Sequence, residues 1–184
     1  ALGKLREIDP GAFEKRGGTE ILVASGEKRE DGALWDYTTA EPGDGWSAVG
    51  FRPGKGWKKG RGAIGAGAAG KRSATRVDPG DIWMQTTFLL EEIPAGLKMR
   101  VFHDDGAEIY LNGERVAALK GHVSEYTDVK LERAALGVLQ TGRNVVSVHC
   151  RYEGGGQLFD LELAAGEGEI DPALLIAERG DDVL

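Results

Sequence analysis

A glycine-rich segment, GAIGAGAAGKRS at residues 62–73, carries a motif that could bind a nucleotide. The glycines within residues 65–70 have the G-x-G-x-x-G spacing of dinucleotide-binding loops, and Lys71 follows as in a phosphate-binding loop. Such a loop needs a strand directly before it and a helix directly after it, because the helix N-terminus holds the phosphate. We expect no strand in KGWKKGRG and no helix in SATRVDPGD, and Arg72 replaces the metal-binding Ser or Thr. We therefore interpret the segment as a flexible or tightly turning loop between strands.

Two tryptophans, Trp46 and Trp57, lie in loop-like sequence with polar neighbours. A ring in such a place can stack on the flat apolar face of a sugar, while nearby polar side chains bond the sugar hydroxyls. The structural alternative, which we favour, is that each ring covers an edge of the folded domain. Trp35 and Trp83 lie in strand-like sequence and are expected in the core.

The run His103-Asp104-Asp105 gathers an imidazole and two carboxylates. Carboxylate oxygens could bind calcium or sugar hydroxyls. The alternative, which we again favour, is that Asp104 or Asp105 caps the tight turn that follows by accepting backbone N–H bonds. Oxygen-rich turns such as EPGDG and DPGD also occur, so a structural calcium ion is the one cofactor that stays open, and we expect no other.

Nucleophilic and carboxylate chemistry have little support in the sequence. Adjacent residues of a strand point to opposite faces, so Cys150 is expected to face the core as a small buried hydrophobe rather than to act as a thiolate. Glu108 and Asp160 fall at strand positions expected to face outward, but no local pattern pairs carboxylates for glycoside hydrolysis. We therefore expect no active site, and the chain is not expected to be an enzyme.

Short strands must position these residues. Apolar and polar residues alternate with period two, the mark of half-buried strands, and Asn112-Gly113 between two such runs predicts a hairpin turn. Turn clusters separate the runs at even spacing, which predicts an all-β antiparallel β-sandwich or jelly roll. One short helix is expected within residues 132–139. The runs are 21–23, 34–38, 97–102, 107–111, 127–131, 144–152 and 157–163.

The 184 residues fit one domain with appendages: an N-terminal extension at 1–19, a β-sandwich domain at 20–165, and a C-terminal extension at 166–184 with a short helix from Asp171. The net charge of −7 and the lack of a basic face argue against a nucleic-acid partner. The basic cluster at 55–61, with Lys71 and Arg72 nearby, is interpreted as solvated charge first and as an anion contact second. No apolar run is long enough for a membrane span.

Several segments together resemble the galactose-binding-domain-like jelly roll, especially accessory domains attached to secreted bacterial glycoside hydrolases. They include DIWMQTTFLL, HDDGAEIYLNG, GRNVVSVHC and GGQLFDLEL, within residues 33–164. The resemblance implies short peripheral helices and an extracellular or periplasmic, non-catalytic module that binds carbohydrate or serves an adjacent catalytic domain. Members of this superfamily also include domains that only pack against a neighbour. A purely structural or protein-interaction domain with no small-molecule ligand is therefore the alternative.

A sugar site, if the chain has one, is expected in loops at one end of the sandwich. Loops gather there from several strands and can carry both ring faces and polar groups. The residues expected to form it are Trp46, Trp57, Asp104, Asp105, Tyr126 and Gln157.

Overall fold

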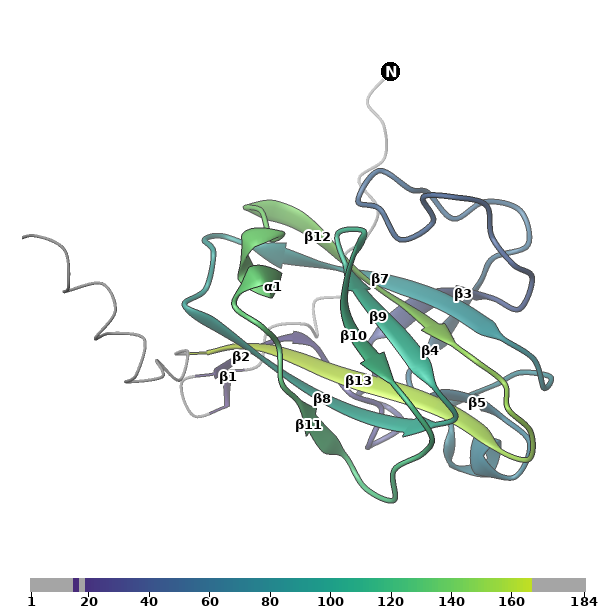
Figure 1. The fold of residues 1–184 in the computed structure, drawn as a ribbon. Helices are drawn as coiled ribbons and strands as arrows, with labels where there is room; N and C mark the ends of the chain where they lie inside the picture. Colours follow the sequence, from purple (N-terminus) through teal and green to yellow (C-terminus); the bar gives the residue numbers. More distant parts are fainter. Residues whose placement is uncertain (1–14, 17–18, 167–184) are drawn as a thin grey trace, which may run out of the picture.

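Two β-sheets pack face to face as a sandwich in the computed structural model, which describes residues 15–16 and 19–166 (Figure 1). In the first sheet the strand order is β1-β2-β13-β5-β6, with β8 on the other edge of β13 and β11 beyond β8. Its strands are β1 (Lys15–Arg16), β2 (Thr19–Val23), β5 (Ile64–Ala66), β6 (Thr75–Arg76), β8 (Gly96–Asp104), β11 (Thr127–Val129) and β13 (Gln157–Gly166).

The second sheet has the order β10-β9-β12-β7-β3-β4. Its strands are β3 (Leu34–Thr38), β4 (Lys58–Arg61), β7 (Ile82–Leu90), β9 (Ala107–Leu111), β10 (Glu114–Leu119) and β12 (Gly142–Cys150). The predicted all-β sandwich is confirmed. One detail differs from the antiparallel prediction, because β5 and β6 pair in parallel.

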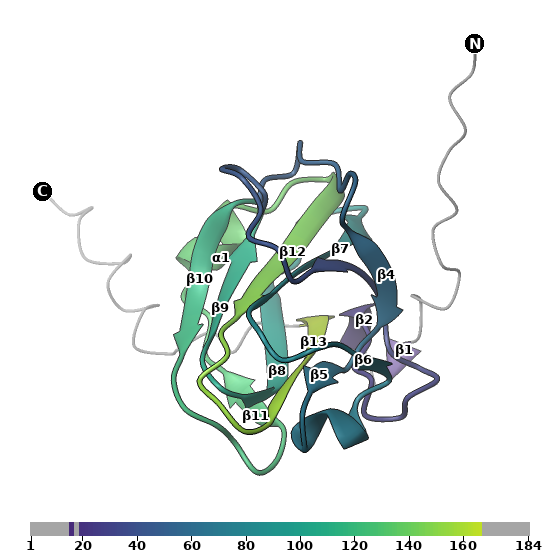
Figure 2. The same cartoon turned by 90° about the vertical axis from the view of Figure 1, so that its right-hand side faces the viewer.

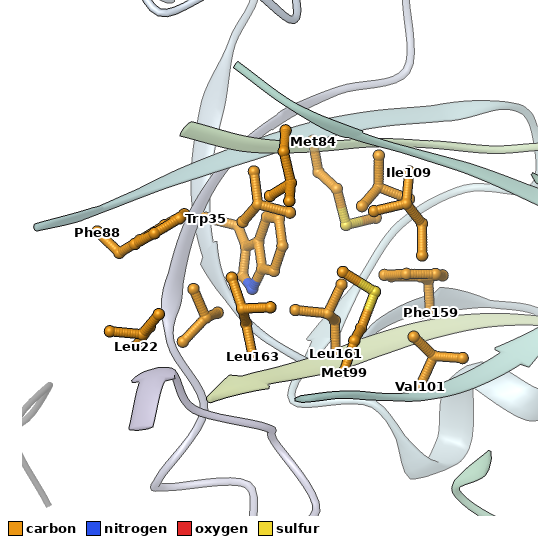
Figure 3. Packing of buried hydrophobic residues seen from close by; sticks show 14 of the residues in the cluster. Leu22, Trp35, Met84, Phe88, Met99, Val101, Ile109, Phe159, Leu161 and Leu163 are labelled. Atoms are coloured by element: carbon orange, nitrogen blue, oxygen red, sulfur yellow. The ribbon is translucent and has the colours of Figure 1, made fainter. Parts of the chain in front are cut away.

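The core lies between the sheets and follows the period-two alternation of the sequence. From β13, Phe159, Leu161 and Leu163 point inward, and Met84 of β7 faces them from the second sheet (Figure 3). Trp35 is buried in the same core, as predicted. Trp83, also expected in the core, is buried outside this cluster, where its ring stacks on His149 at a centroid distance of 4.6 Å.

Strand β13 is the centre of the first sheet. It pairs with β8 along all but its first residue, from Leu158 to Gly166. Its other edge is divided between two strands: β5 pairs with residues 157–159 and β2 with residues 163–165. Two separate parts of the chain therefore meet at the middle of one edge of this strand.

The glycine-rich segment is a tight structural corner. Contrary to expectation, the strand β4 precedes the segment and β5 lies within it, whereas the only helix is a four-residue 3₁₀ helix, η2 (Ala69–Arg72), which contains the last glycine of the segment. A Cβ on Gly65 would lie 2.4 Å from the carbonyl oxygen of Gln157, and one on Gly67 would lie 2.4 Å from that of Gly155. Gly67 also has φ +60°. These glycines are needed because two backbones pack closely here.

The predicted hairpin at Asn112-Gly113 joins β9 to β10, and both residues have positive φ. The Asn112 side chain donates to the Asn144 side-chain oxygen at 2.8 Å, which ties the turn to β12. Strand β10 is the outer strand of its sheet, and its pairing shifts register between Arg115 and Ala117. Helix α1 (Ala134–Gly137) lies within the predicted 132–139.

A long loop, residues 39–57, crosses the outer face of the second sheet. The Gln85 side chain of β7 donates to the Trp46 carbonyl at 2.8 Å, and the Arg143 guanidinium of β12 donates to the Val49 carbonyl. The loop therefore contacts the middle of β7 and the start of β12. No helix of the described part of the chain is long and apolar enough to cross a membrane.

The predicted extensions fall mainly outside the described residues, and the predicted helix from Asp171 lies wholly outside them. Within the described residues, β1 lies in the predicted N-terminal extension, and β13 ends at Gly166.

Removing a core side chain should destabilise the domain strongly. Leu161 is fully buried between the sheets, so Leu161→Ala is expected to lower the free energy of unfolding by about 2–5 kcal/mol through lost burial and a residual cavity. Urea titrations followed by tryptophan fluorescence would measure it. The control is Leu89→Ala, at a leucine with 37% of its surface exposed, with an expected change within about 0.5 kcal/mol. Equal losses in the two variants would contradict this packing.

Candidate functional site

Three of the sequence-predicted site residues, Asp104, Asp105 and Gln157, lie close together at one end of β8 and β13. Asp105 is buried with φ +76°, and its Oδ2 accepts a hydrogen bond from the Glu153 backbone N–H at 2.8 Å. Gln157 is fully buried and donates to the Arg151 carbonyl at 3.1 Å. Asp105 and Gln157 thus hold the loop between β12 and β13 in place. Because neither side chain is at the surface, we leave both out of the candidate site.

The two loop tryptophans, Trp46 and Trp57, do not share a platform with these residues. Trp46 packs edge-on against Tyr110 of β9, with ring centroids 5.6 Å apart and an interplanar angle of 72°. Trp57 packs against Phe51 of the same loop at 5.5 Å. Both indoles are half-buried. Trp57 thus packs within the loop 39–57, and Trp46 packs this loop against the second sheet.

Tyr126 lines a groove on the outer side of the first sheet, away from the core. We call it the arginine–aromatic groove. Its volume is about 330 Å³, the size of a small ligand site. The groove is lined by two arginines, two aromatic rings and two glutamates. The lining residues are Gly26, Glu27, Ala63, Arg72, Arg100, Phe102, Ser124, Glu125, Tyr126 and Leu158.

Each arginine of the groove lies over one ring. The Arg72 guanidinium is 4.6 Å from the centroid of Phe102, and that of Arg100 is 5.1 Å from the centroid of Tyr126. The centroids of the two rings are 5.7 Å apart. Stacking fixes the plane of a guanidinium while its N–H edges stay available for hydrogen bonds. Arg100 also lies 3.6 Å from both Glu27 and Glu162, so acceptors flank the donors.

A buried carboxyl group, that of Asp160, is hydrogen-bonded to the groove residue Tyr126. Its Oδ2 accepts hydrogen bonds from the Tyr126 hydroxyl at 2.5 Å and the Gly26 N–H at 2.7 Å. Its Oδ1 has no partner among the described residues. Asp160 points away from the core, as expected, but the prediction that it faces solvent is wrong: only 1% of its surface is exposed. The segments around Gly26, Gly62 and Tyr126 cover it.

Burial controls the ionisation of this pair. Desolvation raises the pKa of Asp160 to about 7, against hydrogen bonds from Tyr126 and Gly26 that favour the carboxylate. Desolvation also raises the pKa of the Tyr126 hydroxyl, and the neighbouring Asp160 charge adds to the shift. Tyr126 therefore remains a proton donor to Asp160 at neutral pH. A buried carboxyl titrating near neutrality beside a groove is a common property of functional sites.

Most of this groove was missed by sequence reasoning, which named Tyr126 for a sugar site and Arg72 only as solvated charge or an anion contact. One signal was present: Arg100 and Phe102 alternate with the core residues Met99 and Val101, so a phenylalanine lies on the outer face of β8. An aromatic residue on that face needs a cover or a ligand. Arg72 reaches Phe102 from η2, and no local pattern in the sequence indicates that contact.

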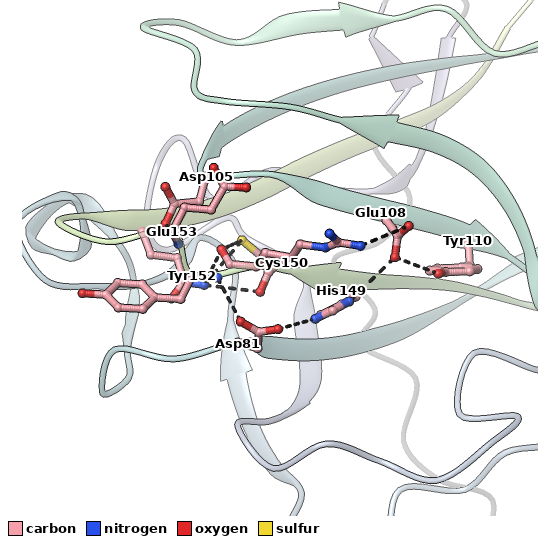
Figure 4. A network of polar contacts seen from close by, with 10 residues as sticks. Asp81, Asp105, Glu108, Tyr110, His149, Cys150, Tyr152 and Glu153 are labelled. Carbon is pink, nitrogen blue, oxygen red and sulfur yellow. Dashed lines mark hydrogen bonds and ion pairs between the residues drawn. The ribbon is translucent and has the colours of Figure 1, made fainter.

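A second polar cluster lies on the outer face of the second sheet (Figure 4). Glu108 of β9 accepts hydrogen bonds from Arg115 at 2.7 Å and Tyr110 at 3.2 Å. His149 lies 3.8 Å from Glu108 on one side and 2.8 Å from Asp81 on the other. Burial acts to raise the pKa of Glu108, but the bonds from Arg115 and Tyr110 outweigh it and lower that pKa. These residues satisfy one another, so we interpret the cluster as structural.

Cys150 is fully buried, as predicted, and burial raises the pKa of its thiol to about 12. Within residues 15–16 and 19–166, no group of three or more His, Cys, Asp or Glu side chains is arranged to hold a metal ion. The structural calcium ion therefore stays a prediction.

Comparison with solved structures places this fold beside parts of larger enzymes. A β-glucuronidase from Ruminococcus gnavus in complex with D-glucaro-d-lactam matches 83% of this chain and 30% of its own, at a TM-score of 0.51 and 14% identity. The same enzyme in complex with C6-substituted uronic isofagomine matches at a TM-score of 0.50, with the same identity and coverage. A Bifidobacterium dentium β-glucuronidase complexed with coumarin-3-O-glucuronide gives 0.48, with 14% identity and 76% of this chain covered.

The chain spans only 21 to 30% of the length of these structures. At 14% identity the likeness shows the fold alone. A scan against protein-family models and a search of curated proteins found no match. The comparison of structures shows that a β-sandwich like this one forms one part of larger β-glucuronidase chains.

The raised pKa of Asp160 predicts a specific pH dependence of stability. Between about pH 4 and 7 the unfolded chain has lost the Asp160 proton while the native state keeps it, so the stability that it contributes falls as the pH rises. The slope for one proton is at most about 1.4 kcal/mol per pH unit. We expect the difference in unfolding free energy between wild type and Asp160→Asn to fall through this range and to level off above it. Parallel profiles from urea titrations would contradict this.

The native Cys150 thiol should be unreactive. The thiol is buried and its pKa is raised. An aromatic disulfide reagent at pH 8 is therefore expected to label Cys150 only as fast as the native structure opens by local or global unfolding. Absorbance of the released thiolate measures the reaction, and the chain in urea, which has the same single cysteine, is the control. Rapid labelling of the native chain would contradict the buried position.

Proposed function

We propose that this chain is a non-catalytic, galactose-binding-domain-like accessory module of a carbohydrate-degrading protein, and that it binds a glycan in the arginine–aromatic groove. The likeness in fold to parts of β-glucuronidases supports the accessory role. The family-like segments support the same role and the proposed extracellular or periplasmic location, in a bacterial secreted system. An adjacent catalytic domain is then the natural partner in the same protein.

The observation that carries the glycan proposal is the pair of guanidinium groups held over the rings of Phe102 and Tyr126 in an open groove. Sugar recognition needs fixed donors and acceptors around an apolar surface, since hydroxyls point outward from the pyranose ring. The groove offers donors from Arg72 and Arg100, acceptors from Glu27 and Glu125, and the edge of Tyr126. Opposite charges side by side favour a neutral, hydroxyl-rich ligand.

A second candidate function is a purely structural or protein-interaction domain. The observation that favours it is that Trp46, Trp57, Asp105 and Gln157 all have partners inside the domain. In this case the groove would contact a neighbouring domain rather than a sugar.

A glycan array with matched arginine variants tests the proposal. Wild type is expected to bind at least one neutral glycan, and Arg72→Ala and Arg100→Ala are each expected to weaken binding about tenfold or more, the usual loss for a charge-assisted hydrogen bond. Titration calorimetry on the best glycan would give the affinities. Arg115→Ala is the control, because this exposed arginine lies on the other sheet.

The outcomes separate the two functions. Folding of each variant is checked by its thermal melt. Silence of the wild-type chain across the array would reject the glycan proposal and favour the structural one. Binding that Trp57→Ala abolishes, and the groove variants do not, would move the site to the loop 39–57.

A further inference from the structure

A second pocket lies where the edges of the two sheets meet. Strand β4 is the edge of one sheet and β6 the edge of the other, and Figure 2 shows them near each other. A side chain of β6 bonds to the backbone of β4: the Thr75 hydroxyl donates to the Arg61 carbonyl at 2.8 Å. The pocket beside this seam has a volume of about 380 Å³. We call it the seam pocket, and its lining residues are Tyr37, Thr38, Thr39, Gly56, Lys58, Arg76, Val77 and Asp78.

Two cations line the seam pocket from different strands. Lys58 comes from β4 and Arg76 from β6, so the meeting of the two sheets brings together charges 18 positions apart in sequence. Among the described residues neither cation is in an ion pair, whereas the adjacent Lys59 is 3.0 Å from Asp36. Two unpaired cations lining one pocket, in a chain of net charge −7, are a local site for an anion.

The remaining lining limits the charge and the shape of that anion. Asp78 adds one negative charge to the pocket, which repels a doubly charged phosphate more than a singly charged carboxylate. The Asp78 carboxylate and the Thr39 hydroxyl are acceptors for ligand hydroxyl groups. The buried Tyr37 also lines the pocket. A ligand with one carboxylate and several hydroxyls matches these groups.

We infer that the seam pocket binds a sugar acid. Its carboxylate lies between Lys58 and Arg76, and its hydroxyl groups bond to Thr39 and Asp78. The seam pocket shares no lining residue with the arginine–aromatic groove. The inference is therefore independent of glycan binding in that groove.

Titration of the full chain with sodium D-glucuronate, followed by two-dimensional NMR of the backbone amides, tests the inference. Saturable shifts are expected at residues 38–39, 56–58 and 76–78. D-glucose, which lacks the carboxylate, is expected to give none at the same concentration. Lys58→Gln and Arg76→Gln are each expected to weaken binding about tenfold, because each removes one charge-assisted contact. Both are surface changes, and the dispersed spectrum of each variant verifies its fold.

Lys55→Gln is the matched control, since it removes the same charge three positions away without changing the pocket lining. It is expected to bind as wild type. Absence of saturable shifts with glucuronate would overturn the inference. Equal weakening by Lys55→Gln would overturn it as well, because binding would then follow overall charge. Sodium sulfate that binds as tightly as glucuronate would show an unspecific anion site and would also overturn the sugar-acid assignment.

Discussion

The first sheet depends on how β13 is paired at the break in one of its edges. The strand β5 covers residues 157–159 and β2 covers 163–165, and neither pairs with the residues between them. Asp160 stands at this break and accepts the N–H of Gly26, just beyond β2. Backbone groups inside a protein must find partners, so a side chain takes the place of a neighbouring strand here. The close packing is visible at Gly26, where a Cβ would lie 1.8 Å from the Gly62 carbonyl oxygen.

The same junction shapes the outer surface. Because Asp160 also accepts the Tyr126 hydroxyl, the loop before β11 is held against β13, and Tyr126 then meets Phe102 and Arg100. The position of Tyr126 in the arginine–aromatic groove is therefore fixed by a buried hydrogen bond to β13. A buried carboxyl whose Oδ1 has no partner within the described part of the chain costs stability, and such a cost is tolerated where the arrangement is needed.

The fold was predictable because alternation is a local property. The core faces of β8, β12 and β13 follow directly from period two, and the hairpin turn follows from the residue types Asn112 and Gly113, which tolerate the positive φ that the turn needs. Strands β5 and β6 were not predictable, because they have only three and two residues and form through contacts with β13 and each other. The groove was largely missed for the same reason. Arg72, Phe102 and Asp160 are far apart in sequence, and only the tertiary fold joins them.

The interrupted pairing of β10 has a consequence for the behaviour of the domain at high concentration. An outer strand presents unpaired N–H and C=O groups, on which a strand of another molecule can extend the sheet. In β10 the register shift leaves Val116 as an extra residue between two short paired stretches, and Glu114 and Arg115 beside it are exposed. A bulge twists the strand and breaks the regular spacing that an added strand would need. This edge is thereby protected against intermolecular sheet growth, and so against aggregation, by its backbone as well as by its charges.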